Sequence, residues 1–156
     1  MKALRCTRII LGFLSSVILV STDSVADEAA NKELAKRWMK EVWQDHNSAY
    51  INEISTEDFD RAEAMAFSEN VFSQYPDWKG SVVKLLAESD TVVMIFRGTG
   101  TSVMPESEGK TVEMDGVVLL TFSNDKIANI QGFWDNWRTM QQLGYTALPP
   151  SIEPSE

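Results

Sequence analysis

Four residues near the end of the chain have the types and the spacing that proton-transfer chemistry needs. Asn129, Gln131, Phe133 and Asp135 alternate along the sequence, so in a strand they share one face. Such a polar file is either the exposed face of an antiparallel sheet or the lining of a polar-tipped pocket. In a pocket, apolar walls raise the pKa of a carboxyl group, which can then move a proton next to a carbonyl group.

Nearby side chains would complete a site of this kind. Gln131 or Asn129 could hydrogen-bond the oxygen of a developing enolate. Phe133, Trp137 and Trp78 could pack against an apolar ligand, although buried aromatic residues more often belong to an ordinary core. Moving a proton in this way requires neither a metal nor a cofactor, and the prediction therefore includes neither.

Other kinds of catalytic site lack the residues they require. The single histidine, His46, and the single cysteine, Cys6, do not make a typical zinc site. The sequence contains no Gly-x-Ser-x-Gly motif, phosphate loop or dinucleotide fingerprint. We interpret His46 as a residue at the C-terminal end of a helix. Arg97 is either a pocket cation for a carboxylate ligand or a marker of the exposed end of a strand.

The elements that would position these residues follow from the apolar periodicity. Asn31 is a good N-cap, and Leu34, Trp38 and Val42 recur every four residues behind it, so a helix is predicted over 31–45. Further helices are predicted at 47–54, 61–74 and 137–143, strands at 82–86, 91–97, 111–122 and 127–135, and a tight turn at 123–126. Helices followed by strands predict an α+β fold with an antiparallel sheet and helices on one face.

The first 26 residues have the three-part order of a secretory signal. Lys2, Arg5 and Arg8 precede an apolar run over 9–20, and small residues lead to Ala26. The run is too short for a membrane span, which needs about 20 residues. We expect cleavage after about Ala26, a periplasmic or secreted domain over 27–148 without a stable membrane anchor, and a flexible tail over 149–156.

The composition is acidic, with a formal net charge of −9. Removal of the leader makes the charge more negative, because the leader carries more basic than acidic residues. A chain of this charge without a basic patch is not expected to bind nucleic acid. Cys6 leaves with the leader, so no thiol or disulfide chemistry is expected afterwards.

Four short segments over about residues 32–145 carry a family resemblance through their order and spacing. They are Tyr75-Pro76-Asp77-Trp78, Gly100-Thr101-Ser102, Gly109-Lys110-Thr111-Val112 with Asp125-Lys126-Ile127, and Phe133-Trp134-Asp135 with Gln142-Leu143-Gly144. Together they resemble the SnoaL-like polyketide cyclases of the nuclear transport factor 2-like superfamily. The resemblance implies a cone-shaped fold, in which a curved antiparallel sheet wraps around a long N-terminal helix. It also implies a pocket, with Asp135 at the acid/base position.

The leading prediction is an exported SnoaL-like pocket protein that acts on a small apolar carbonyl compound. It would be a cofactor-independent cyclase, isomerase or dehydratase with Asp135 as the general acid/base. One alternative is a module that binds a small hydrophobic molecule without converting it. Another is an interaction domain that forms a homodimer through its sheet, with its apolar residues on the outer sheet face, because a fold alone does not decide function.

Overall fold

A helical half, four strands and a short final helix make up the part of the chain that the computed structural model describes, residues 27–146. The expected leader and tail lie outside these residues. The elements are α1 (Glu28–Trp38), a π-helical segment (Met39–Gln44), a 3₁₀ turn (Ser48–Tyr50), α2 (Ile51–Ile54), α3 (Arg61–Gln74), β1 (Lys79–Glu88), β2 (Thr91–Thr101), a second 3₁₀ turn (Pro105–Ser107), β3 (Thr111–Ser123), β4 (Lys126–Trp134) and α4 (Asn136–Gln142).

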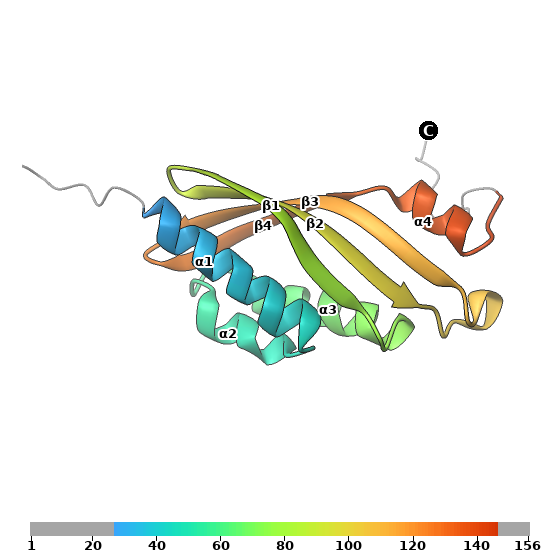
Figure 1. The fold of residues 1–156 in the computed structure, drawn as a ribbon. Coiled ribbons are helices and arrows are strands. Elements are labelled where there is room, and N and C mark those ends of the chain that lie inside the picture. Colours follow the sequence, from blue (N-terminus) through green and yellow to red (C-terminus); the bar gives the residue numbers. More distant parts are fainter. Residues whose placement is uncertain (1–26, 147–156) are drawn as a thin grey trace, which may run out of the picture.

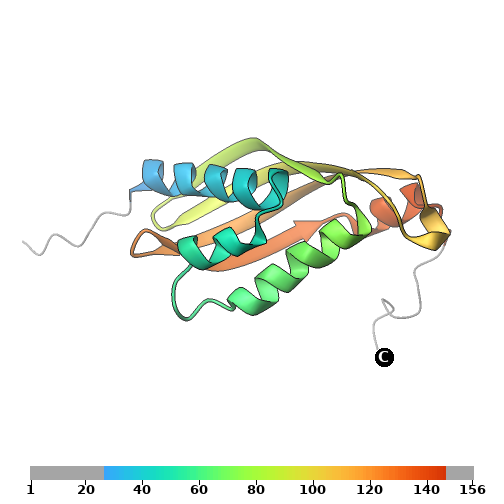
Figure 2. The same ribbon diagram turned by 90° about the horizontal axis from the view of Figure 1, so that it is seen from below.

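The strands form one antiparallel sheet in the order β1-β2-β3-β4. Helices α1, α2 and α3 lie across one face of this curved sheet, and α4 lies at the opposite end of the molecule from the start of α1 (Figure 1, Figure 2). The predicted α+β architecture, with a curved sheet and helices on one face, is confirmed. Asn124 and Asp125 form the predicted turn between β3 and β4 with positive φ angles of 51° and 59°, as a two-residue hairpin turn requires.

The main core lies between the first helix and the helix-facing side of the central strands. Met94 and Leu120 are fully buried there against Ala35 and Val42. Burial of side chains of this size contributes about 1.5–3 kcal/mol each. The same packing fixes which face of the sheet is internal.

The N-cap of the first helix lies four residues before the predicted one. Asp27 caps it, because its Oδ1 accepts the N–H groups of Ala29 (3.0 Å) and Ala30 (3.1 Å). The assignment of Asn31 as the N-cap is therefore wrong, and Asn31 lies inside the helix with 5% of its surface exposed. Both residues suit a cap, and the choice depends on the position of the helix start.

The Tyr75-Pro76-Asp77-Trp78 segment packs so closely against β2 that two positions of this strand have room only for glycine. A Cβ atom at Gly98 would overlap the indole of Trp78, and one at Gly100 would lie 2.9 Å from Cβ of Tyr75. Asp77 Oδ1 accepts the main-chain N–H of Thr101 at 2.6 Å. The two segments that carry part of the family resemblance therefore hold each other in place.

The hydrogen bond to Asp77 predicts a pH-dependent contribution to stability. The N–H of Thr101 lowers the pKa of Asp77 from its ordinary value of 3.8. A lowered pKa stabilises the fold above the unfolded-state value, and this stability is lost as the pH falls through the folded-state value, below 3.8. Wild-type protein should therefore exceed Asp77→Asn in free energy of unfolding at neutral pH. The gap should shrink in denaturant titrations below pH 3.8, and an equal gap at both pH values would contradict the assignment.

Helix α4 is fixed to the sheet by the residues that end it. Gln142 Oε1 accepts the main-chain N–H of Glu113 (2.8 Å), and Gln142 Nε2 donates to the carbonyl of the same residue (3.0 Å). Lys110 Nζ donates to the carbonyl of Leu143 (2.6 Å), and Gly144 adopts a φ of +93°. The side-chain amide of Gln142 thus takes the place of a neighbouring strand where β4 has already ended.

Replacing Gln142 by alanine should loosen α4. The change leaves both main-chain groups of Glu113 without their partner, which should cost about 1–3 kcal/mol in free energy of unfolding. Urea denaturation measures the cost, and hydrogen exchange at the Glu113 amide should accelerate. Gln141→Ala is the matched control, because Gln141 is exposed and its side chain makes no hydrogen bond among residues 27–146. Equal effects of the two variants would argue against a specific role of Gln142.

Candidate functional site

The polar file of β4 lies on the outer face of the sheet, away from the helices. Asn129, Gln131 and Phe133 are all exposed, and they pair with Thr121, Leu119 and Val117 of β3. The prediction that this file lines the interior is wrong, and the alternative of an exposed sheet face holds.

A β-bulge explains the orientation. Ile127 pairs with Phe122 and Asn129 pairs with Thr121, so Ala128 is an extra residue in β4. Ile127 is buried in the core at 1% exposure. Strict alternation from Ile127 would place Asn129 and Gln131 inside. The extra residue moves every later side chain of β4 to the opposite face.

Asp135 follows the last residue of β4 and is exposed. Its Oδ1 accepts the main-chain N–H of Arg138 at 2.9 Å, which makes it the N-cap of α4. It forms no ion pair among residues 27–146. The apolar enclosure expected around this carboxyl group is not present in the single chain.

A shallow hollow of about 400 Å³ nevertheless collects two of the predicted site residues. We call it the β4 hollow, and its lining is largely apolar: Ile95, Asp115, Gly116, Val117, Phe133, Trp134 and Asp135. Asp115 was not identified from the sequence. The register counted back from the turn at Asn124 and Asp125, with one residue allowed for the bulge, pairs Gly116 with Trp134. This register brings the preceding residue, Asp115, close to Asp135.

The two carboxyl groups of the β4 hollow have different surroundings. Arg97 donates two hydrogen bonds to Asp115, from Nε at 2.7 Å and from Nη2 at 3.0 Å. These hydrogen bonds lower the pKa of Asp115 and keep it ionised. Asp135 has no basic partner of this kind in the described part of the chain.

The other four predicted contact residues, which include the exposed Asn129, lie outside the hollow. Trp78 is 4% exposed and packs with Tyr75 in a second core cluster, which favours the alternative of an ordinary core residue. Trp137 is 38% exposed on α4. Gln131 lies two residues before Phe133 on the same face, which places it beside the hollow, about 7 Å along the strand.

His46 and Arg97, whose roles the sequence left open, both have structural partners. The Nε2–H of His46 donates to the carbonyl of Trp78 (2.7 Å), and the ring stacks on Phe72 at 4.1 Å. His46 adopts a φ of 56° just after the helix ends. Arg97 forms an ion pair with Asp115 across β2 and β3 on the outer face.

Aromatic side chains fill the space between the helices and the sheet. Trp43 makes edge contacts with Trp38 (6.0 Å), Phe67 (6.1 Å) and Phe72 (5.7 Å), and Phe67 reaches Trp134 (5.8 Å). The indole N–H of Trp43 is buried without a hydrogen-bond partner among residues 27–146. An unpaired buried donor lowers the free energy of unfolding by about 1–3 kcal/mol. The sequence pattern did not predict this unpaired group.

Neither a metal-binding cluster nor a membrane-spanning helix occurs among residues 27–146. In this range no group of three or more His, Cys, Asp or Glu side chains is arranged to hold a metal ion. None of the helices described is both long and apolar enough to cross a membrane.

Comparisons with known proteins agree on one family and one fold. The model of the SnoaL-like polyketide cyclase family matches residues 33–143. A proposed SnoaL-like polyketide cyclase from Jannaschia sp. CCS1 is 24% identical, with a TM-score of 0.67, over 78% of this chain and 95% of that protein. A proposed polyketide cyclase from Acidithiobacillus ferrooxidans is 21% identical, with a TM-score of 0.67, over 76% and 96%.

A third solved structure extends the fold comparison. It is a Catenulispora acidiphila protein of ketosteroid isomerase-like fold in complex with trimethylamine, 15% identical with a TM-score of 0.64, over 78% of this chain and 98% of that protein. At these identities the likeness concerns the fold. No curated protein sequence matches the chain.

Proposed function

Since the chain belongs to the SnoaL-like polyketide cyclase family, we propose that it is a cofactor-independent enzyme acting on a small apolar carbonyl compound. Asp135 is the general acid/base. The observation that carries this proposal is the β4 hollow, which Asp135 lines together with the apolar side chains of Ile95, Val117 and Phe133. A carboxylate next to apolar walls suits a reaction in which a proton leaves carbon and returns elsewhere.

The proposed chemistry is a proton relay at one carbonyl compound. Asp135 takes a proton from the carbon next to the carbonyl group, and the electron pair moves onto the carbonyl oxygen as an enolate. The enolate then follows one of three routes. It attacks a second carbonyl group, whose oxygen takes the proton from Asp135; it takes that proton back at another carbon; or it expels a β-hydroxyl group, which accepts the proton and leaves as water. These three outcomes are cyclisation, isomerisation and dehydration, and each uses the same first step.

The neighbouring groups have defined parts in this scheme. Phe133, Ile95 and Val117 pack against the apolar body of the ligand. Gln131, beside the hollow, is placed to hydrogen-bond the enolate oxygen. Asp115 stays ionised against Arg97. It therefore keeps that guanidinium engaged and leaves proton transfer to Asp135.

The test is native mass spectrometry of the protein isolated from its own cells, followed by NMR of any retained compound in D₂O. A retained apolar ketone or aldehyde whose α-protons exchange faster with enzyme present supports the proposal. A retained compound that never exchanges supports the alternative of a binding module. Protein without any retained compound, together with no exchange on a panel of apolar ketones, would overturn the enzyme proposal.

A homodimer through the outer sheet face is a second proposal, carried by a different observation. Two cross-strand rows expose apolar side chains there: Leu86, Val93 and Leu119 in one row, and Ile95, Val117 and Phe133 in the next. Leu86 is 50% and Phe133 is 61% exposed.

Light scattering after size exclusion tests the dimer. Wild-type protein should run as a dimer and Leu86→Glu as a monomer, because a charge in an apolar interface is costly. Leu86 lies outside the β4 hollow, so this variant leaves the proposed catalytic group in place. Wild-type protein that stays monomeric at high concentration would contradict the proposal.

Export is also proposed, from the order of charge and apolar residues in the leader. The leader lies outside the described residues, so the sequence alone supports this step. Intact-mass analysis of protein from the periplasm or medium should give a chain that begins at about Asp27. A full-length chain confined to the cytoplasm would contradict it.

A further inference from the structure

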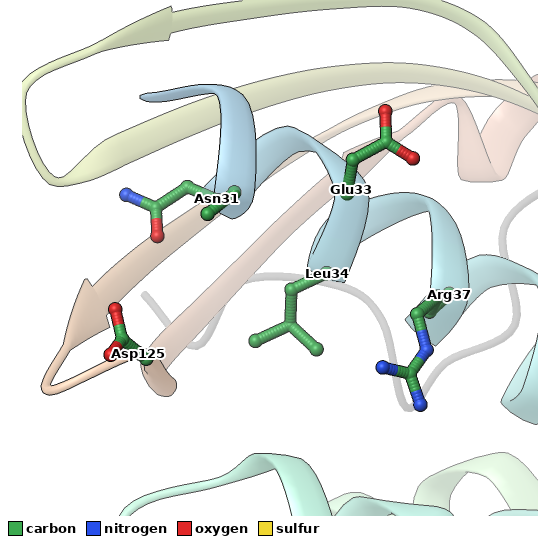
Figure 3. A pocket seen from close by; sticks show the side chains of 6 residues that line it. Asn31, Glu33, Leu34, Arg37 and Asp125 are labelled. Atoms are coloured by element: carbon green, nitrogen blue, oxygen red, sulfur yellow. The ribbon is translucent and has the colours of Figure 1, made fainter. Parts of the chain in front are cut away.

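A second hollow lies at the opposite end of the molecule from α4, between α1 and the β3–β4 turn. Its volume is about 290 Å³, at the small end of the usual range for ligand sites. We call it the α1 hollow, and its lining residues are Ala30, Asn31, Glu33, Leu34, Arg37 and Asp125 (Figure 3). It shares no residue with the β4 hollow, so ligand binding there would be independent of the proposed reaction.

Asn31 is the buried polar group of this hollow. It is 5% exposed, and its side chain has no hydrogen-bond partner among residues 27–146. Figure 3 shows its amide directed toward the carboxylate of Asp125. An amide has donors and an acceptor to satisfy, and here the open side of the hollow is the direction from which a partner can come.

The two ends of the hollow carry opposite charges. Asp125 lies at one end and forms no ion pair within the described range. Arg37 lies at the other end, where its guanidinium is held 5.6 Å from the centre of the Tyr50 ring and is likewise free of ion pairs in that range. Glu33 is engaged by Lys36 at 2.6 Å and points to the other side of the helix (Figure 3).

The spacing defines the kind of molecule that fits. Asn31 and Arg37 are six residues apart in α1, which corresponds to about 9 Å along the helix axis. Leu34 lies midway and points to the same side as Arg37 (Figure 3). A complementary ligand has an ammonium group at one end, a short apolar middle and a carboxylate at the other end.

We propose that the α1 hollow binds a small zwitterion with separated charges, of the ω-amino acid or dipeptide class. The ammonium group is received by the Asp125 carboxylate and the Asn31 amide oxygen. The carboxylate is received by Arg37, and the apolar middle rests on Leu34. Both ion pairs are exposed, so binding is weak and falls as salt is added.

The test uses 6-aminohexanoate as the probe, followed by amide NMR shifts in titrations of the mature protein. Saturable shifts should appear at residues 30–37 and 123–126. Hexanoate and hexylamine, which carry one charge each, should bind roughly threefold to fivefold more weakly. Arg37→Gln and Asp125→Asn should weaken the zwitterion to a similar degree. Glutamine suits a helix and asparagine tolerates positive φ, so both variants should keep the local backbone.

Three results would overturn the proposal: no saturable shift with 6-aminohexanoate, equal shifts with the singly charged analogues, or wild-type affinity in both variants. The first two use wild-type protein and do not depend on whether a variant folds. Asp135→Asn should bind the probe as wild type does. A failed enzyme proposal would therefore leave this result unchanged.

Discussion

Replacing Asp135 by asparagine is expected to lower turnover by about 10²- to 10⁴-fold and to leave the fold intact. Asparagine caps a helix as well as aspartate does, so the N–H of Arg138 keeps its acceptor. The variant loses only the group that exchanges a proton. The measurements are α-proton exchange of the retained compound by NMR and thermal unfolding of both proteins.

Two further variants make this result specific. Asp135→Ala removes both the carboxyl group and the cap, so it should lose activity and also about 1 kcal/mol of stability. Asp115→Asn is the matched carboxyl control, because Asp115 lines the same hollow but is held by Arg97. Its effect on turnover should be far smaller. Unchanged exchange in Asp135→Asn would place the reacting group elsewhere in the molecule.

Replacing Trp78 by alanine is expected to lower the free energy of unfolding by about 3–5 kcal/mol. The indole is 4% exposed, packs with Tyr75 and Leu143, and lies against the bare Cα of Gly98. On the Gly98 side no side chain is available to fill the space, because that wall is main chain. Chemical denaturation measures the loss.

Trp137→Ala is the control for this prediction, since that indole is 38% exposed. Its effect on stability should stay within about 0.5 kcal/mol. The comparison also separates two roles for Trp78. A Trp78→Ala protein of wild-type stability that has lost its ligand would restore the original interpretation of Trp78 as a ligand contact.

Much of the fold follows from the sequence because its signals are local. The four-residue apolar spacing marks the first helix, β-branched runs mark the central strands, and the residues at 123–126 mark the turn. The boundaries were less well predicted. β1 begins at Lys79 instead of residue 82 and continues to Glu88, because pairing with β2 extends a strand beyond its apolar part.

The site was harder to predict because it depends on one unpaired residue. Asn129, Gln131 and Phe133 were correctly grouped on one face, but the face itself is set by the bulge at Ala128. No composition signal separates a bulged alanine from an ordinary strand alanine. Asp115 was missed for the same reason, since its proximity to Asp135 depends on the register between β3 and β4.

The side-chain bridge from Gln142 to Glu113 has a consequence for behaviour in crowded solution. β3 extends past the end of β4, and its first residues would otherwise present open main-chain groups to any passing peptide. Such a ragged border invites strand addition between molecules and the growth of aggregates. The amide of Gln142 occupies the main-chain N–H and carbonyl of Glu113 in the middle of this edge. A strand from another molecule therefore cannot pair there, although β4 does not extend that far.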